Sequence, residues 1–168
     1  MARKMSELER TAYHEAGHAV AAFALNRRVR SVTVIPDGDT LGQNLYGKAR
    51  MIQPDAGVDR RTRNEIERRF ICAMAGWAVE AKLNPRRRGI ATGSNDLQHA
   101  SDLASYVVGS AEELEAYSNW LWIRTKQLIA LPHYWAAIEA LAGELVTHKR
   151  LGERRVREVI ETSLTAPL

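Results

Sequence analysis

The 168-residue chain has few of the features from which cross-links or membrane spans are made. It contains a single cysteine, Cys72, so no disulfide can form within it. Cys72 lies in the apolar segment Phe-Ile-Cys-Ala-Met, a setting typical of an unreactive core thiol. The longest apolar stretch, residues 70–79, is about half the length of a membrane-spanning helix. We therefore expect no membrane association.

The amino-terminal residues also lack the pattern of a secretory leader. Residues 1–10 are charged, and the segment after them carries His and Glu. We therefore expect a cytoplasmic protein. The length and a composition of 45% hydrophobic and 26% charged residues predict one globular domain, residues 1–168. A start at Met1 with a helix cap soon after it favours a standalone protein over an excised domain.

Positive charge is only in modest excess, with a formal net charge of +4. Arginine contributes most of it in short runs, at residues 60–61, 68–69, 86–88 and 154–155. Such runs are typical of solvated helix faces and of a basic loop. A nucleic-acid site would add a known motif or exposed aromatic residues among the cations, and neither is evident. We do not expect nucleic acid as a partner.

The apolar pattern predicts a mainly α-helical fold with a small amino-terminal β-sheet. Ser6 and Glu9 have the spacing of a capping box and predict a helix that runs to about Leu25. The β-branched run at residues 29–35 predicts a strand, and a second extended segment is expected at residues 45–52. Further helices are expected at residues 58–83, 94–108, 112–131, 133–149 and 151–162.

The segment His14-Glu15-Ala16-Gly17-His18 carries the clearest chemical signal. Residues four apart lie about 40° apart around a helix axis, so both imidazoles point the same way. They can share one zinc ion at about 2.0–2.1 Å, with positions left for a third ligand and a water. Glu15 is placed to take a proton from that water and pass it to the leaving amine. The alternative of two surface or core histidines is less favoured, because the motif lies in a capped helix without proline.

The third ligand must come from elsewhere, because no third histidine or acid follows at close helical spacing. The richest candidate region contains Asp96, His99 and Asp102. Asp96 also has the position of an acid that simply compensates a helix dipole. Spacing alone leaves the three in competition. His133 and His148 lie far along the chain among tryptophans and basic residues, where structural roles are favoured.

Five segments of the chain form a recognisable set. They are residues 12–20 (AYHEAGHAV), 32–36 with Leu41-Gly42, 73–80 (AMAGWAVE), 92–97 (TGSNDL) and 141–151. In this order they resemble the peptidase domain of the FtsH family of ATP-dependent zinc metalloproteases, namely its zinc-site helix, its strand and glycine loop, its LAGRAAE helix, its TGASNDL segment and its C-terminal helical pair. The likeness covers nearly the whole chain.

This resemblance implies a mostly helical zinc peptidase whose third metal ligand is an aspartate. Position by position, His14 and His18 match the histidine ligands, Glu15 the catalytic base and Asp96 the aspartate. His99 and Asp102 then become candidates for residues beside the ligands or on the surface. A ligating histidine usually donates its other nitrogen to an acid or a carbonyl, so an acid near the site is expected. TGASNDL is one residue longer than the segment here, so the approach of Asp96 to the metal could differ.

The resemblance also sets expectations for activity and partners. The family's proteases carry transmembrane segments and an ATPase module before the peptidase domain, whereas these 168 residues contain no Walker-type Gly-Lys loop. We expect an ATP-independent zinc endopeptidase that cuts peptides or unfolded chains, or one that depends on a separate ATPase or adaptor partner. The residues from Gly42 to Ile52 could offer an edge strand to an extended substrate.

Two further expectations concern assembly and loss of activity. The family's hexameric rings suggest a homo-oligomer. The alternative to a protease is a binding or regulatory module that keeps the fold with reduced or no proteolysis. The presence of all four matched residues argues against that alternative, because a non-catalytic descendant has no reason to keep Glu15.

Overall fold

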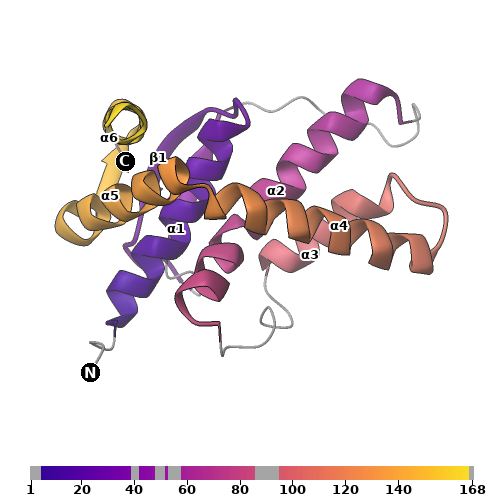
Figure 1. Ribbon diagram of the computed structural model, residues 1–168, viewed down its shortest axis with the longest axis horizontal. Coiled ribbons are helices and arrows are strands. Elements are labelled where there is room, and N and C mark those ends of the chain that lie inside the picture. Colours follow the sequence, from indigo (N-terminus) through magenta and orange to yellow (C-terminus); the bar gives the residue numbers. More distant parts are fainter. Residues whose placement is uncertain (1–4, 39–41, 48–51, 53–57, 86–94, 167–168) are drawn as a thin grey trace.

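The computed structural model describes residues 5–38, 42–47, 52, 58–85 and 95–166 (Figure 1). These residues confirm a mainly α-helical fold with a small sheet. In chain order the elements are α1 (Glu7–Ala24), β1 (Val29–Thr33), β2 (Gln43–Tyr46), α2 (Arg60–Leu83), α3 (Asn95–Ser105), α4 (Ala111–Ala130), α5 (Pro132–His148), β3 (Arg150–Gly152) and α6 (Glu153–Thr165). Leu41, residues 48–51, the arginine run 86–88 and residues 92–94 lie outside the described residues.

Helix α1 is the element around which the others pack. Its predicted capping box is present: the Glu9 amide donates to Ser6 Oγ at 3.2 Å, and the Ser6 amide donates to the Glu9 carboxylate at 2.8 Å. Its inner surface consists of small, fully buried side chains, among them Ala12 and Ala16. A Cβ at Gly17 would lie 2.6 Å from Cγ2 of Val79, so glycine allows α1 and α2 to approach closely at the motif.

The sheet has the strand order β2-β1-β3, and both pairings are antiparallel. The prediction of an amino-terminal sheet was therefore incomplete, because the third strand comes from the other end of the chain. Leu151 pairs with Val32, and both side chains are buried, so the chain is extended at Leu151 and α6 begins two residues later than predicted. The second strand was predicted at residues 45–52, but β2 begins earlier, at Gln43, and ends at Tyr46.

The remaining helices form a second layer that places α3. Helices α5 and α4 follow one another across the molecule, with Pro132 at the start of α5 (Figure 1). Helix α5 packs on α1, whereas α4 packs on α2 and α3. Ala100 and Ala104 of α3 are fully buried in a cluster with Phe70 and Met74 of α2. This packing carries the first turn of α3 to the motif on α1.

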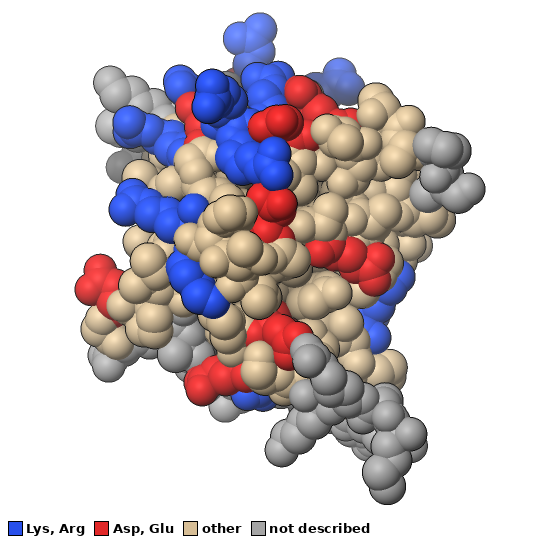
Figure 2. Space-filling model, turned by 90° about the vertical axis from the view of Figure 1, so that its left-hand side faces the viewer, with Lys and Arg blue, Asp and Glu red and all other residues tan. Residues whose placement is uncertain are grey.

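Charged side chains are mixed on the face that includes α6. Lys and Arg gather at the top of this face, with Asp and Glu among them (Figure 2). Arg155 pairs with Glu144 at 3.0 Å, and Arg157 pairs with Glu161 at 2.8 Å. The run at residues 154–155 thus lies on a solvated helix face, as predicted, whereas Arg69 of the run 68–69 has a side chain that is only 15% exposed. Across the described chain, no helix is both long and apolar enough to span a bilayer.

Candidate metal centre

The fold brings His14, His18 and Asp96 together from two helices. The Nε2 atoms of His14 and His18 are 3.0 Å apart. Oδ2 of Asp96 lies 3.5 Å from Nε2 of His14 and 3.6 Å from Nε2 of His18. Ligand atoms around a tetrahedral zinc at 2.0–2.1 Å would be separated by about 3.3 Å. The three atoms therefore form a triangle of the size that one zinc ion requires.

The other ring nitrogen of each histidine has its own acceptor. Nδ1 of His14 lies 2.7 Å from Oε1 of Glu80 on α2, and Nδ1 of His18 lies 2.6 Å from the backbone carbonyl of Cys72. Carboxylates and carbonyls only accept hydrogen bonds, so each Nδ1 carries a proton and donates it. These bonds fix the orientation of both rings and leave Nε2 of each facing Asp96.

The electrostatics of the site favour a cation. Burial would lower the pKa of His14, but the carboxylates of Asp96 and Glu80 outweigh it and raise this pKa to about 9. Burial would likewise raise the pKa of Asp96, but the imidazoles of His14 and His18 bring it well below its usual range. Acidic groups thus surround the two histidines, and a metal ion can replace the proton that His14 holds.

Strand β2 holds Glu15, the residue between the histidines. The Asn44 amide donates from Nδ2 to Oε2 of Glu15 at 2.6 Å and to its backbone carbonyl at 3.1 Å. Glu15 is only 6% exposed. A Cβ at Gly42 would lie 2.7 Å from Cγ of Glu15, so this position leaves no room for a larger side chain unless Glu15 moves. The carboxylate of Glu15 is therefore held in one place beside the triangle.

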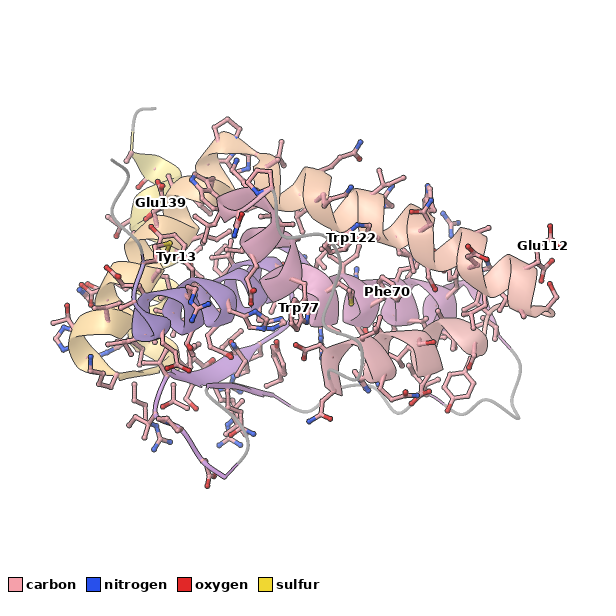
Figure 3. The ribbon with its side chains drawn as sticks, turned by 90° about the horizontal axis from the view of Figure 1, so that it is seen from below. Tyr13, Phe70, Trp77, Glu112, Trp122 and Glu139 are labelled. Carbon is pink, nitrogen blue, oxygen red and sulfur yellow. The ribbon has the colours of Figure 1, made fainter. Side chains whose placement is uncertain are left out.

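Helix α2 supports the ring of His14 at three points. Glu80 accepts its Nδ1 proton, and the Trp77 indole packs edge-on against it with ring centroids 5.3 Å apart. Trp77 lies on α2 between α1 and α3 (Figure 3). A Cβ at Gly76 would lie 2.6 Å from Nε2 of His14, so the ring occupies the space that a side chain would fill. His14 thus has little freedom to rotate.

The site opens into a cleft of about 570 Å³ bordered by α1, α2, α3 and β2. His99 is exposed and borders this cleft, whereas Asp102 accepts a hydrogen bond from Gln98 at 2.7 Å. Among the interactions of the described residues, none joins either side chain to the two imidazoles. Asp96, His99 and Asp102 competed for the third ligand position. Of these three side chains, only Asp96 contacts the imidazoles of His14 and His18.

Three residues that contribute to the site were not individually predicted as site residues. A partner acid for a histidine was expected, and Glu80 has this contact; it is the last residue of the AMAGWAVE segment. Cys72 was predicted as a core residue, and it is buried, but its carbonyl also fixes His18. Asn44 gave no signal, because its contact with Glu15 depends on how the sheet packs on α1.

The fold and the site are those of a metalloprotease-type domain. The chain belongs to peptidase family M41, whose sequence profile matches residues 1–112. The ATP-dependent zinc metalloprotease FtsH of Magnetococcus marinus is 32% identical over 162 residues, which cover 92% of this chain and 21% of that protein. The ATP-dependent zinc metalloprotease FtsH 2 of Sphaerobacter thermophilus is 34% identical over 148 residues, 83% of this chain and 21% of that protein. The chain thus spans about a fifth of the length of these relatives.

Proposed function

We propose that this domain is a zinc-dependent endopeptidase that hydrolyses peptides or unfolded protein chains without ATP. The observation that carries the proposal is the convergence of His14, His18 and Asp96 beside Glu15 in one cleft. The printed names of the relatives, ATP-dependent zinc metalloproteases, support the choice of metal and reaction. We further propose that the domain acts in the cytoplasm.

The residues at the site fit a zinc ion in both donor type and spacing. His14 and His18 would bind through Nε2, and Asp96 through Oδ2, a nitrogen and oxygen set that zinc accepts. Bound zinc supplies Lewis-acid chemistry, since it lowers the pKa of a water and polarises the scissile carbonyl. Glu80 and the Cys72 carbonyl hold the two rings in the orientation that binding requires.

The role of Glu15 is to move the proton. Its carboxylate accepts a proton from the attacking water and returns it to the leaving nitrogen of the substrate. The hydrogen bond from Asn44 occupies Oε2, which leaves Oε1 to exchange the proton. Because Glu15 is buried at the base of the cleft, bulk water competes little for this carboxylate.

Strand β2 is the proposed binding edge for substrate. It lies at the end of the sheet order and borders the cleft, and among the described strands it pairs only with β1. An extended peptide could add to its other edge through backbone hydrogen bonds, which accept many side chains. Methylation of single backbone amides in a good substrate should reduce binding at the paired positions. Equal cleavage of every methylated peptide would rule out this mode of binding.

Partners outside these residues complete the proposal. Residues 1–168 contain no Walker-type loop, so ATP-driven unfolding of a folded substrate would require a separate ATPase or an adaptor. The relatives are named ATP-dependent, which supports such a partner. We also propose self-association of the domain, which sedimentation equilibrium of the purified chain would test.

The decisive experiment combines metal analysis with peptidase assays of the wild type and Glu15→Gln. We expect one zinc per chain in both, and a fall in kcat of about 10²–10⁴-fold in the variant. Zinc in both proteins with no cleavage by either would instead support a binding or regulatory module. Failure of the wild type to bind added zinc would contradict every metal-dependent role.

A further inference from the structure

Arg27 borders the cleft, and it follows directly after the helix that carries both histidines of the proposed metal site. Helix α1 ends at Ala24, and Asn26 reverses the chain with a positive φ of 55°. The Arg27 amide then donates to the carbonyl of Ala22 at 2.8 Å. The backbone of Arg27 is thus fixed to the same helix that carries His18.

The side chain of Arg27 contacts two other residues that border the cleft, Tyr46 and Cys72. Its guanidinium lies over the Tyr46 ring of β2, 4.8 Å from the ring centroid. It is also close to the Cys72 thiol: burial raises the pKa of this thiol, and Arg27 acts in the opposite direction. The carbonyl of Cys72 accepts the hydrogen bond from His18. A single residue therefore lies between Arg27 and a histidine of the proposed metal site.

The charge of Arg27 is not balanced by an acid in the described structure. Its neighbour Arg28 pairs with Glu153 at 2.6 Å, and Arg69, which also borders the cleft, pairs with Glu65 at 2.8 Å. Within the described part of the chain, no carboxylate forms an ion pair with Arg27. Arg27 is partly buried and borders the cleft, where the carboxylate of a ligand would compensate its charge.

We propose that Arg27 forms a subsite that binds a carboxylate of the substrate and so selects peptides with an acidic group close to the scissile bond. This inference rests on the proposed peptidase function and adds its substrate class. The planar guanidinium binds a carboxylate with two parallel hydrogen bonds, which gives selectivity over a neutral amide of the same shape. The carboxylate can belong to a Glu or Asp side chain or to the carboxyl terminus of a peptide.

The test uses fluorogenic peptides with acetylated and amidated ends. A single Glu is moved across the three positions on each side of the scissile bond, and each peptide has a partner with Gln at the same position. At one position, wild type should cleave the Glu peptide with a kcat/KM about tenfold or more above that of the Gln peptide. A second set with a free carboxyl terminus distinguishes terminal from side-chain recognition.

Variants assign the preference to Arg27. In Arg27→Gln the ratio of kcat/KM for Glu over Gln should fall to about 1, whereas Arg27→Lys should retain part of it. Arg28→Gln removes the same charge one residue away and should leave both the ratio and the activity as in wild type. Arg27→Glu should invert the preference, so that the Gln peptide is cleaved faster than the Glu peptide.

Two results would overturn the proposal: no Glu preference in wild type at any position or at the terminus, or the same preference in Arg27→Gln. In the second case Arg27 only supports Tyr46, and its loss would lower the melting temperature alone.

If no peptide is cleaved, the same peptides are titrated into zinc-loaded Glu15→Gln by fluorescence anisotropy. If Glu peptides bind more tightly than Gln peptides, and the double variant Glu15→Gln/Arg27→Gln loses this difference, the carboxylate subsite holds although the peptidase function fails. Equal binding of Glu and Gln peptides would reject the subsite as well as the peptidase function.

Discussion

His14 and Glu80 are 66 residues apart in sequence, yet Nδ1 of the imidazole lies 2.7 Å from Oε1 of the carboxylate. This contact joins α1 to α2 directly beside the proposed metal site. It sets which ring nitrogen of His14 carries the proton and aims the other nitrogen at Asp96. The position of a ligand on one helix therefore depends on an acid on another.

Removal of the Glu80 carboxylate should weaken metal binding. We expect Glu80→Ala to lower the affinity for zinc by about 10–100-fold, because the ring of His14 loses its orienting partner. The measurement is a competition titration against a chromogenic chelator. Glu112→Ala is the control, since Glu112 is an exposed acid on the distant end of α4 (Figure 3). Equal affinity in wild type and Glu80→Ala would contradict the role of Glu80.

Zinc affinity should depend on pH through His14. In the metal-free protein the pKa of His14 is raised to about 9, so at neutral pH the ring holds a proton that zinc must displace. Affinity should therefore rise with pH, by up to about tenfold per unit below about pH 9 from this group alone, and then level off. Calorimetry in buffers of different ionisation enthalpy should detect about one proton released from His14 near pH 7. A constant affinity from pH 7 to 9 would contradict this coupling.

Local signals were sufficient for the elements that depend on their own sequence. The Ser6 and Glu9 spacing predicted the start of α1, because a capping box needs only residues within one turn. Leu151 was assigned to a helix instead of a strand, because a three-residue strand is too short to show alternation. Its extended backbone depends on pairing with Val32, more than a hundred residues earlier. Such long-range pairing has no local signal.

In the candidate site, too, some residues could be predicted from local sequence, whereas others depend on long-range packing. His14, Glu15 and His18 could be predicted together because helix geometry alone places the two imidazoles on one face of α1, with Glu15 beside the first of them. Asp96 could not be separated from other polar groups of α3 by spacing, since its approach depends on how α3 packs against α2. Asn44 was not predicted, because its contact forms only when the sheet meets α1.

The contact of Asn44 with Glu15 should matter for turnover rather than metal binding. In Asn44→Ala the carboxylate of Glu15 loses its only side-chain hydrogen bond in the described structure, so its position becomes less defined. We expect kcat to fall by about 10–100-fold with one zinc per chain retained. Asn119→Ala is the control, because Asn119 is an exposed residue of α4 that does not border the cleft. Loss of zinc from Asn44→Ala, or an unchanged kcat, would show that Asn44 does not act through Glu15.

Gly76 should tolerate no side chain, although it lies in a helix where alanine is intrinsically favoured. A Cβ there would lie 2.6 Å from the His14 ring, so Gly76→Ala must displace the ring or separate α1 from α2. We expect a loss of about 1–3 kcal/mol in the free energy of unfolding of the metal-free protein, together with weaker zinc binding. Gly143 of α5 is the matched control, because a Cβ there meets no atom within 4 Å, and Gly143→Ala should gain up to about 1 kcal/mol. Urea unfolding and zinc titration of both variants are the measurements. If Gly76→Ala unfolds and binds zinc as the wild type does, α2 does not hold His14 in place.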